Sequence, residues 1–434
     1  MAEIHPFQGV HYNESLIKDW SAAICPPHDI ISPRQQEELY KSSEYNFVRL
    51  EYGRVLPDDK ITNNRYTRSA ATLEQWLKQG ALETDKVPAI YLHDHIFTLE
   101  GKEYKRRSFI VRVRLEEWDK MIIRPHENTM AVTRSDRLSL LQALQANTSP
   151  ILAMFEDRQQ QIYSQLPGQA QRPPLITSKI VNGEGHNLWA ITDTAAINQI
   201  TKSLAEQPIY IADGHHRYES ALAYRNDKRA SNNSGDAAFN FVMMELVDFA
   251  HPGLKILAPH RLVRGISKAT LDKLMPKLEE FFEIEKAPLN ITNVRKQVED
   301  FFNATGGVRF VLFGLSAGNL LKLKLRDPAV ASQMIPGSHS ELYKKLDVSI
   351  VDHIILEKIL GMAKGGDKTG LAYNHDLLDV VNRVTNQEYQ LATLLSPVKP
   401  EVLKAIADAG DKMPTKSTYF YPKSPSGLIF NRLV

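Results

Sequence analysis

Five consecutive residues, Asp213-Gly214-His215-His216-Arg217, combine a carboxylate, a glycine, two imidazoles and a guanidinium. Residues 208–212 have the short apolar pattern of a buried strand, and the residues from 215 to 224 have helical spacing. A turn at Asp213-Gly214 is therefore expected to lead a strand into the start of a helix. The first amides of a helix and the positive end of its dipole bind anions, so the segment predicts a phosphate-binding turn.

Each side chain of this turn has an expected role. Gly214 lacks the Cβ that would keep a phosphate off the backbone, and His215, His216 and Arg217 add hydrogen-bond donors and positive charge. Asp213 beside these cations is best explained by Mg²⁺, which prefers one or two carboxylates together with phosphate oxygens. The structural alternative is that Asp213 only caps the helix and the histidines pack or lie on the surface. Two histidines and an arginine in one helical turn favour the functional interpretation.

Other candidates are more widely spaced. His126-Glu127 and Thr129 follow a predicted strand in a loop, where they offer a general base or metal ligand, or else a surface ion pair. His260-Arg261 could contact phosphate or pair with an acidic neighbour, and Lys416 could reach phosphate or be solvated. His93 and His95 alternate on a predicted strand, but a third ligand is not evident, so a polar strand face is the expected explanation.

The elements that position these residues follow from hydrophobic periodicity. Residues 89–99 and 104–115 predict a β-hairpin, and residues 70–79, 195–205 and 346–360 predict helices. Strands are expected at 45–50, 151–155 and 239–249, the last in a sheet interior because it is apolar on both faces. Residues 265–306 are expected to be largely helical, followed by a second β pair.

Composition excludes several classes of protein. The chain has 434 residues, 43% hydrophobic and 24% charged, with 53 Lys and Arg against 51 Asp and Glu. A net charge of +2 gives no overall basic field for nucleic acid, and a single cysteine excludes an internal disulfide framework and a multi-thiolate zinc site. The N-terminus does not resemble a signal peptide and no stretch of about 18 apolar residues occurs. A cytoplasmic protein that binds neither membrane nor nucleic acid is expected.

The chain also resembles a known family along nearly its whole length. It is similar to the large prokaryotic "domain of unknown function" family numbered one thousand and fifteen, whose members are linked to ATP-dependent free L-serine kinases. The matching elements are Pro6-Phe7, Pro26-Pro27-His28-Asp29-Ile30-Ile31-Ser32, His126-Glu127-Asn128-Thr129, Asp136-Arg137-Leu138, Ala146-Asn147-Thr148-Ser149-Pro150-Ile151, the 213–218 motif, Gly253-Leu254, Pro259-His260-Arg261 and Met413-Pro414-Thr415-Lys416-Ser417-Thr418-Tyr419-Phe420. One departure is His28, which stands where the family usually has tyrosine.

The Asp-Gly-His-His-Arg motif in addition looks like that of the ParB and sulfiredoxin superfamily, in which a strand, turn and helix grip nucleotide phosphates. The resemblance implies an α+β fold with a mixed-sheet ParB/sulfiredoxin-like nucleotide-binding core, large insertions and a C-terminal α+β subdomain. We place the catalytic domain at residues 1–265 and the C-terminal subdomain at 266–434. Sulfiredoxin chemistry is not expected, because His215 replaces the catalytic cysteine.

The resulting hypothesis is phosphoryl transfer from ATP to free L-serine, giving O-phospho-L-serine. Gly214, His215, His216 and Arg217 would hold the nucleotide, assisted by His126, Thr129, His260, Arg261 and Lys416. Asp213 and Glu127 would hold Mg²⁺, and Glu127 is the expected base, with His126, His216 or Asp213 as alternatives. The competing hypotheses are a kinase of another small hydroxylated metabolite and a ParB-like, nucleotide-switched DNA clamp.

Overall fold

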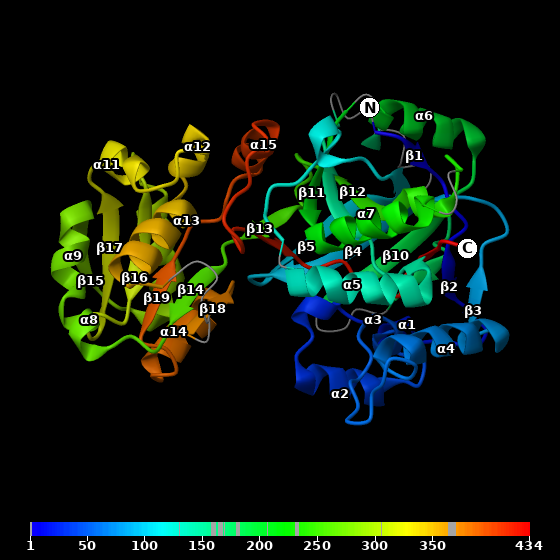
Figure 1. Cartoon of the computed structure of the whole chain (residues 1–434), viewed down its shortest axis with the longest axis horizontal. Coiled ribbons are helices and arrows are strands. Elements are labelled where there is room, and N and C mark those ends of the chain that lie inside the picture. The colour runs from blue at the N-terminus through cyan, green and yellow to red at the C-terminus, as the bar shows by residue number, and fades with distance from the viewer. Residues whose placement is uncertain are drawn as a thin grey trace. The chain divides into compact units, whose positions relative to one another are not determined.

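The computed structural model describes residues 2–129, 131–157, 162–163, 168, 170–178, 183–205, 207–230, 234–304, 306–362 and 370–434. Contacts divide the chain into two units (Figure 1). Unit 1 comprises Met1–Pro125, Thr129–Lys255 and Pro422–Val434, and unit 2 comprises His126–Asn128 and Ile256–Tyr421. Within the described residues, the helices are too short or too polar to cross a lipid bilayer.

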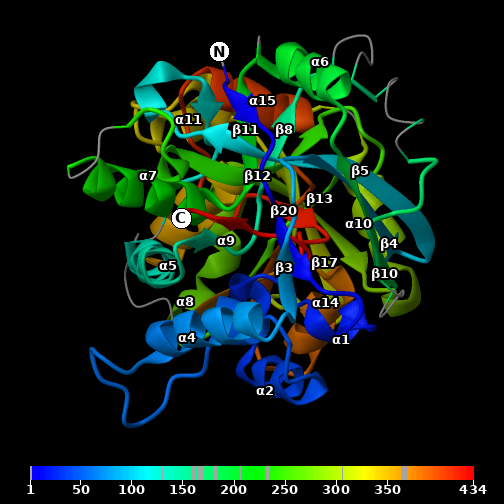
Figure 2. The same ribbon diagram turned by 90° about the vertical axis from the view of Figure 1, so that its right-hand side faces the viewer.

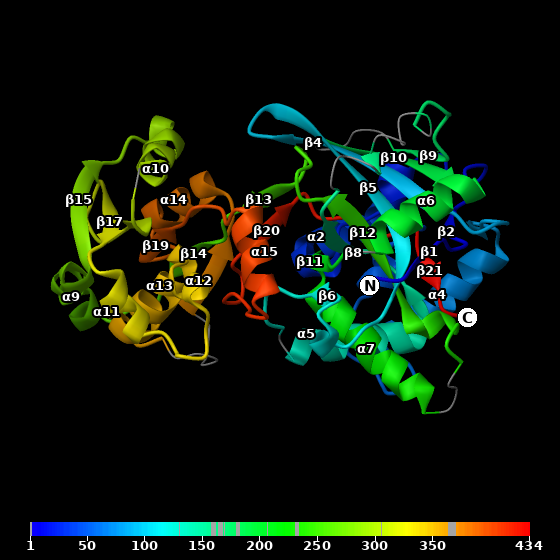
Figure 3. The same cartoon turned by 90° about the horizontal axis from the view of Figure 1, so that it is seen from above.

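A mixed nine-stranded sheet forms the centre of unit 1, in the order β6-β11-β8-β12-β5-β4-β10-β9 with β1 beside β5. The pairs β11–β6 and β12–β8 are parallel, and the other pairs are antiparallel. Its strands are β1 (Ile4–His5), β4 (Ile90–Leu99), β5 (Lys102–Arg114), β6 (Ile123–Arg124), β8 (Ile151–Phe155), β9 (Ile176–Thr177), β10 (Glu184–Ile191), β11 (Ile209–Asp213) and β12 (Phe241–Asp248). The predicted hairpin is confirmed as β4 and β5, the long twisted pair in Figure 3. The interior strand is confirmed as β12, which is buried throughout.

Alternating side chains give this sheet two apolar faces. Leu92, Phe109 and Met244 belong to one core, which also receives α6 (Thr194–Ala205) and α7 (His215–Arg229). Tyr91 and Met243 belong to the other core, which is closed by the N-terminal helices and by residues 428–430. The period of two along each strand thus separates the two faces of the sheet, as sequence patterns of this kind predict.

Short helices cover these faces. They are α1 (Trp20–Ala23), α2 (Pro33–Ser42), α3 (Val48–Glu51), α4 (Arg65–Lys78) and α5 (Ala131–Leu144), with short 3₁₀ turns at His28–Ile30, Trp118–Lys120 and Ala238–Asn240. Figures 1 and 2 both show α6 on the opposite side of the sheet from α2 and α4. Two small strand pairs, β2 (Val10–Tyr12) with β3 (Leu82–Thr84) and β7 (Ala146–Asn147) with β21 (Asn431–Arg432), complete the unit.

One predicted strand of unit 1 is wrong. The pattern of residues 45–50 predicts an extended segment, but α3 begins at Val48. The Asn46 side chain accepts a hydrogen bond from the Val48 N–H at 3.0 Å, which favours the helical turn. The aromatic and branched residues of this segment reflect burial of Phe47, Val48 and Leu50 in the core rather than a strand.

Unit 2 contains an antiparallel six-stranded sheet in the order β15-β17-β16-β19-β14-β18. Figure 3 shows α10 and α14 on one face, where both contribute to a single apolar core. The strands of this sheet are β14 (His260–Val263), β15 (Phe282–Pro288), β16 (Arg309–Phe313), β17 (Asn319–Leu325), β18 (Leu371–Asn374) and β19 (Leu391–Leu394). Two further strands, β13 (Lys255–Leu257) and β20 (Tyr419–Tyr421), form a separate pair. The helices are α8 (Lys268–Asp272), α9 (Leu274–Phe281), α10 (Val294–Phe302), α11 (Pro328–Gln333), α12 (Glu341–Lys344), α13 (Asp347–Ile350), α14 (Leu377–Thr385) and α15 (Pro400–Asp408), with a 3₁₀ turn at Ile291–Asn293.

Two expectations for unit 2 have different outcomes. The helix predicted at 346–360 is confirmed as α13 and a π-helical segment, Val351–Ile359. The prediction that 265–306 is largely helical is wrong in its middle, because Phe282–Pro288 forms β15 and pairs with β17 over its whole length. Pairing with a later strand, which local spacing does not reveal, decides the conformation of this segment.

The α+β class and the mixed sheet agree with expectation, whereas the division of the chain differs from the proposed boundary after residue 265. Pro422–Val434 belongs to unit 1 because β21 pairs with β7 and because Phe430 bonds Val10 in both directions. The C-terminal segment therefore returns to unit 1 after the residues that form unit 2.

Candidate active site

Asp213 and Gly214 form the turn between β11 and α7. Gly214 has a φ of +97°, and a Cβ built on it would lie 2.8 Å from Nε of Arg217. The backbone conformation therefore requires glycine, and a Cβ at this position would displace the Arg217 guanidinium. Tyr218 N–H donates to the Gly214 carbonyl at 3.1 Å, so the 15-residue helix α7 begins directly after the turn with the positive end of its dipole here.

Tyr218 anchors the first turn of α7 to the segment that contains Glu116 and Trp118. Its buried hydroxyl accepts a hydrogen bond from the Glu116 N–H at 2.9 Å and donates to the Glu116 carbonyl at 2.8 Å. Its ring packs against Trp118 with centroids 4.6 Å apart. His215 is buried and His216 is half-buried. Tyr218 therefore fixes the first turn of α7 to the backbone of Glu116.

The Asp213 carboxylate lies between two cations. Arg217 Nη2 donates to Oδ2 at 2.8 Å, and the Lys423 ammonium donates to Oδ1. Burial opposes ionisation of Asp213, but Lys423 and Arg217 outweigh it and hold the pKa of the carboxyl well below its ordinary value. Asp213 is therefore a carboxylate at neutral pH, with each oxygen already paired.

Arg217 is a bridge between the turn and another segment. Nη1 donates to Ser149 Oγ at 2.9 Å and to the Pro150 carbonyl at 2.6 Å, while Nη2 binds Asp213. The sequence predicts that the guanidinium contacts phosphate, but these three contacts direct it into the protein. Arg217 thus positions Asp213 against residues 149–150.

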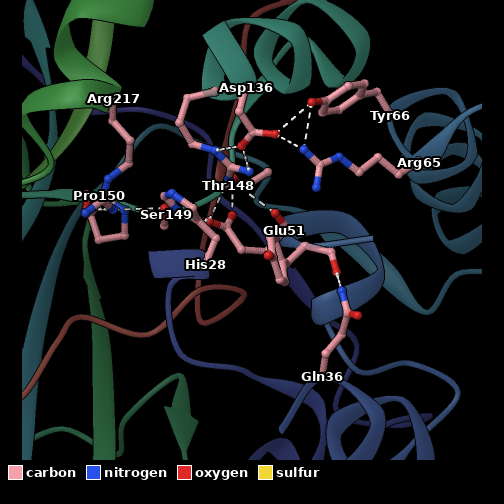
Figure 4. A network of polar contacts seen from close by, with 12 residues as sticks. His28, Gln36, Glu51, Arg65, Tyr66, Asp136, Thr148, Ser149, Pro150 and Arg217 are labelled. Atoms are coloured by element: carbon pink, nitrogen blue, oxygen red, sulfur yellow. Dashed lines mark hydrogen bonds and ion pairs between the residues drawn. The ribbon is translucent and has the colours of Figure 1, made fainter. Parts of the chain in front are cut away.

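A second ion network joins residues from five segments of unit 1 (Figure 4). At its centre, the buried Glu51 carboxylate accepts from Thr148 Oγ1 at 2.6 Å and from Arg137 Nη1 at 3.3 Å, and His28 Nδ1 lies 3.6 Å away. Burial opposes ionisation of Glu51, but His28, Arg137 and Thr148 outweigh it, and the pKa of Glu51 is lowered. Asp136 extends the network to Arg65 and Tyr66.

Thr148 and Ser149 connect the two networks. Between them lies a cavity of about 40 Å³, which Glu51 and Arg217 both line. A space of this size holds a few water molecules, whereas ligand pockets have volumes of roughly 300–1,000 Å³. Segments that the family resemblance singles out, at 28, 136–137, 147–150 and 217, are thus joined by side-chain contacts and a small cavity.

Unit 2 brings together four of the other candidates. Glu127 Oε1 accepts from the Lys416 backbone N–H at 2.7 Å, and Arg261 Nη1 donates to the Lys416 carbonyl at 3.1 Å. Both contacts hold the backbone of Lys416, which has a φ of +60°. His126 is buried and lies 3.0 Å from Thr418 Oγ1 through Nε2.

His260 and Arg261 are the first two residues of β14, and both are buried. Arg261 Nε lies 3.1 Å from Asp352 Oδ1, and His260 Nδ1 accepts from the Leu395 N–H at 3.1 Å. Burial and the neighbouring charges of Arg261 and His375 lower the pKa of His260 to about 3. Through these contacts His260 holds the backbone of residue 395, and Arg261 holds the backbone of residue 416. Thr129 belongs instead to unit 1, where it donates to Glu219 of α7 at 2.5 Å.

The alternating histidines of β4 meet partners that the sequence did not reveal. His93 Nδ1 lies 2.9 Å from Glu245, His93 Nε2 lies 3.1 Å from His186 Nδ1, and His95 Nε2 lies 3.1 Å from Glu184. Ligand atoms of His95, Glu184 and His186 fall within 4.8 Å of one another, a spacing that could hold a metal ion.

Arg106 decides between a metal site and a hydrogen-bonded cluster. Its Nη2 donates to His95 Nδ1 at 3.3 Å, so Nε2 must carry the proton of the neutral ring and donate it to Glu184. A metal ligand needs the opposite arrangement, a free Nε2 and a protonated Nδ1 facing an acceptor. Burial and the nearby charges lower the pKa values of His95 and His186 well below the ordinary range. We interpret the cluster as a hydrogen-bonded histidine network rather than a metal site.

Residues 4–349 match the sequence model of the family described as "Protein of unknown function (DUF1015)". The chain belongs to this family. A sequence search of curated proteins found no match to this DUF1015 chain.

Several solved structures are similar to the DUF1015 chain. A conserved hypothetical protein from Pyrococcus furiosus is 13% identical, covering 74% of this chain and 93% of its own, with a TM-score of 0.35. A free serine kinase in complex with AMP is 14% identical, covering 74% and 89%, with a TM-score of 0.35. SbnI with C-terminal truncation from Staphylococcus aureus is 9% identical, covering 73% and 85%, with a TM-score of 0.35.

Sequence reasoning on this DUF1015 protein missed Lys423 and Glu51. Lys423 lies in a segment whose pattern predicts only a C-terminal strand, and its side chain is 8% exposed. Glu51 is an ordinary acidic residue in the sequence but has no exposed side-chain surface. The Pro422-Lys423-Ser424-Pro425 context predicts a turn, but it gives no sign that the lysine is buried and paired.

Proposed function

We propose that this DUF1015 protein is a nucleotide-dependent phosphotransferase that uses ATP and transfers phosphate to a small hydroxyl compound, with free L-serine as the first candidate. The observation that carries the proposal is the turn at Asp213-Gly214, where a helix N-terminus and two cationic side chains surround one carboxylate. This arrangement suits a multiply charged phosphate ligand. The resemblance of the Asp-Gly-His-His-Arg segment to nucleotide-binding turns supports the same conclusion.

In the proposed reaction the acceptor oxygen forms a bond to the γ-phosphorus of ATP while the bond from that phosphorus to the bridging oxygen breaks. The hydroxyl proton passes to a base and ADP leaves. Such reactions need positioning and charge neutralisation more than covalent chemistry. Gly214 would allow the phosphates to approach the α7 amides, and His215 and His216 would add donors at the same point.

Glu127 is the proposed base, and Lys416, His126, Thr129, His260 and Arg261 are proposed supports of nucleotide or acceptor binding. Oε1 of Glu127 accepts a hydrogen bond from the Lys416 backbone N–H, which orients the carboxylate. Arg261 would act through Lys416, whose carbonyl it holds. Replacing Glu127 with Gln is expected to reduce turnover by about 100-fold or more.

Bound Mg²⁺ would supply charge neutralisation at the phosphates. Asp213 is the proposed ligand from unit 1, but both of its oxygens are paired with cations in this structure. With both oxygens paired, the Asp213 carboxylate does not fit a metal ion, and no step of the proposed reaction involves one.

The test is incubation of the purified protein with ATP, Mg²⁺ and a panel of hydroxyl compounds that includes L-serine, followed by ³¹P NMR of the products. Gly214→Ala is expected to abolish transfer, because its Cβ would meet Arg217. Gly80→Ala is the matched control: Gly80 has a φ of +72°, and a Cβ added there would have nothing within 4 Å, so transfer should persist. Transfer to another hydroxyl compound would redefine the acceptor. No phosphorylated product and no nucleotide-dependent thermal shift would overturn the proposal.

A further inference from the structure

Residues 422–424 contact two buried, charged side chains of the central sheet of unit 1. The Pro422 carbonyl accepts from Nη1 of Arg106 in β5 at 2.9 Å, and the Ser424 hydroxyl donates to Oε2 of Glu245 in β12. The strands β5 and β12 are neighbours in the sheet, and both charged residues are fully buried. The segment is therefore held from inside the protein at both of its ends.

Glu245 is an ionised carboxylate in this interior. Its Oε1 accepts from Ser108 Oγ at 2.6 Å and lies 2.9 Å from His93 Nδ1. Burial opposes ionisation of Glu245, but His93 and Arg106 outweigh it and hold the pKa of the carboxyl well below its ordinary value. Apolar residues of similar volume often stabilise a protein as well as buried ionic groups do, so this network favours a role in fixing one arrangement.

Lys423, between the two held residues, reaches the turn at Asp213-Gly214. Its side chain is 8% exposed, and the ammonium donates to Oδ1 of Asp213. Burial lowers the pKa of Lys423, but Asp213 and Asp29 outweigh it, so that the ammonium is retained. Lys423 therefore places positive charge beside the start of α7, where a phosphate would bind.

We propose that Glu245, acting through the Ser424 hydroxyl, is a positioning residue that holds the Lys423 ammonium beside the Asp213-Gly214 turn and so raises the affinity of this turn for nucleotide phosphates. Glu245 does not touch the nucleotide, and its effect passes through residues 423 and 424. The inference rests on the proposed function for its ligand. It gives a role to a buried carboxylate that the proposed reaction does not otherwise use.

The first test needs no nucleotide. It is reductive methylation with formaldehyde and cyanoborohydride, followed by mass spectrometry of the peptide that contains Lys423. Wild-type Lys423 should react slowly because it is buried and paired. Ser424→Ala should raise its methylation rate about 10-fold or more, as expected when a hydrogen bond to a charged group is lost. An unchanged rate would overturn the positioning role.

The chain offers a matched control for this substitution. Ser426 lies in the same segment and is fully buried, but its hydroxyl has no hydrogen-bond partner among the described residues. Ser426→Ala therefore removes a buried hydroxyl without breaking a side-chain hydrogen bond, and Lys423 should react in it as slowly as in wild-type protein. Ser424→Cys, which keeps the size of the side chain but donates weakly, is the second variant should Ser424→Ala fail to fold.

The second test is a double-mutant cycle on ATP affinity, measured by calorimetry in the presence of Mg²⁺. Ser424→Ala and Lys423→Met should each weaken ATP binding by about 10-fold. The double variant should bind no more weakly than Lys423→Met alone, because both substitutions withdraw the same cation from the turn. Additive effects would show that Ser424 acts by a general structural route, and unchanged affinity in Ser424→Ala would show that it does not act on the turn. Either result would overturn the proposal.

The two tests separate this inference from the proposed function. Ser426→Ala should bind ATP as wild-type protein does. Failure of wild-type protein to bind ATP would overturn the proposed function, and with it the effect on nucleotide phosphates. The methylation rates would still decide whether the contact between Glu245 and Ser424 holds Lys423 in place.

Discussion

Ser149 and Arg217 are 68 residues apart in the sequence, and the Ser149 hydroxyl accepts a hydrogen bond from Nη1 of Arg217 at 2.9 Å. This contact ties the segment that ends at Pro150 to the turn that begins α7. Because the same guanidinium holds Asp213, a substitution at Ser149 is expected to alter the position of the Asp213 carboxylate indirectly, through Arg217.

We expect Ser149→Ala to lower the free energy of unfolding by about 1 kcal/mol and to weaken nucleotide binding several-fold, because Arg217 loses one anchor. The measurements are denaturant unfolding and calorimetric titration with ATP and Mg²⁺. Ser139→Ala is the control, since that hydroxyl bonds the Ser135 carbonyl of its own helix. A variant with full affinity would show that Arg217 does not need this bond.

Removing the charge of Glu51 should be costly. The carboxylate accepts from Thr148 and Arg137 in the protein interior, and Glu51→Gln would leave Arg137 beside a neutral amide. The expected loss is about 3 kcal/mol of unfolding free energy, measured in urea. Glu74→Gln is the matched control: Glu74 pairs with Arg432 at the surface, and its loss should cost about 0.5 kcal/mol or less. Equal effects of the two variants would contradict the buried network.

The pH dependence of stability should carry a contribution from His260. Its pKa is lowered from 6.5 to about 3, so unfolding takes up a proton below pH 6.5. The stabilisation is complete above pH 6.5 and decreases as the pH falls towards about 3, by roughly 2–3 kcal/mol at pH 4.5. His260→Asn, whose amide oxygen can replace Nδ1 as acceptor for Leu395, should flatten this slope in urea unfolding series. An unchanged slope would show that the imidazole is not held neutral.

The hydrogen-bonded histidine network leads to a prediction about metal ions. Since Arg106 donates to His95 Nδ1 and repels a dication, wild-type protein should not bind Co²⁺ stoichiometrically at this cluster. Arg106→Met should raise Co²⁺ affinity, and adding His95→Asn should abolish the gain. Visible absorption spectroscopy of Co²⁺ provides the readout. Tetrahedral Co²⁺ bands in wild-type protein that disappear in His95→Asn would establish a metal site instead.

Local patterns predicted the elements but not all of their partners. The turn at Gly214 could be predicted because the requirement for glycine, the apolar strand and the helical spacing are all encoded within about fifteen consecutive residues. The β15 strand could not, because its identity depends on pairing with β17, which begins at Asn319. Helix α3 resembles a strand in sequence because burial and β propensity favour the same residue types.

The residues of the candidate site that escaped prediction are those whose roles depend on distant contacts. Lys423 is 210 residues from Asp213, and Thr148 is 97 residues from Glu51. A lysine or a glutamate carries no local sign that it will be buried, so only the tertiary structure reveals the pairing. Arg217 could be identified from the sequence but its direction could not, since spacing along a helix says nothing about whether a guanidinium points to solvent or to a serine hydroxyl.

The return of residues 422–434 to unit 1 has a consequence for biosynthesis. The ribosome makes the whole segment from Ile256 to Tyr421 after the strands of the central sheet and before the segment that brings Lys423 to Asp213 and Ser424 to Glu245. A nascent chain that has reached residue 421 therefore holds the Asp213 turn without its second counter-ion. Only the codons after that for residue 421 supply the lysine that completes the charge pairing at this turn.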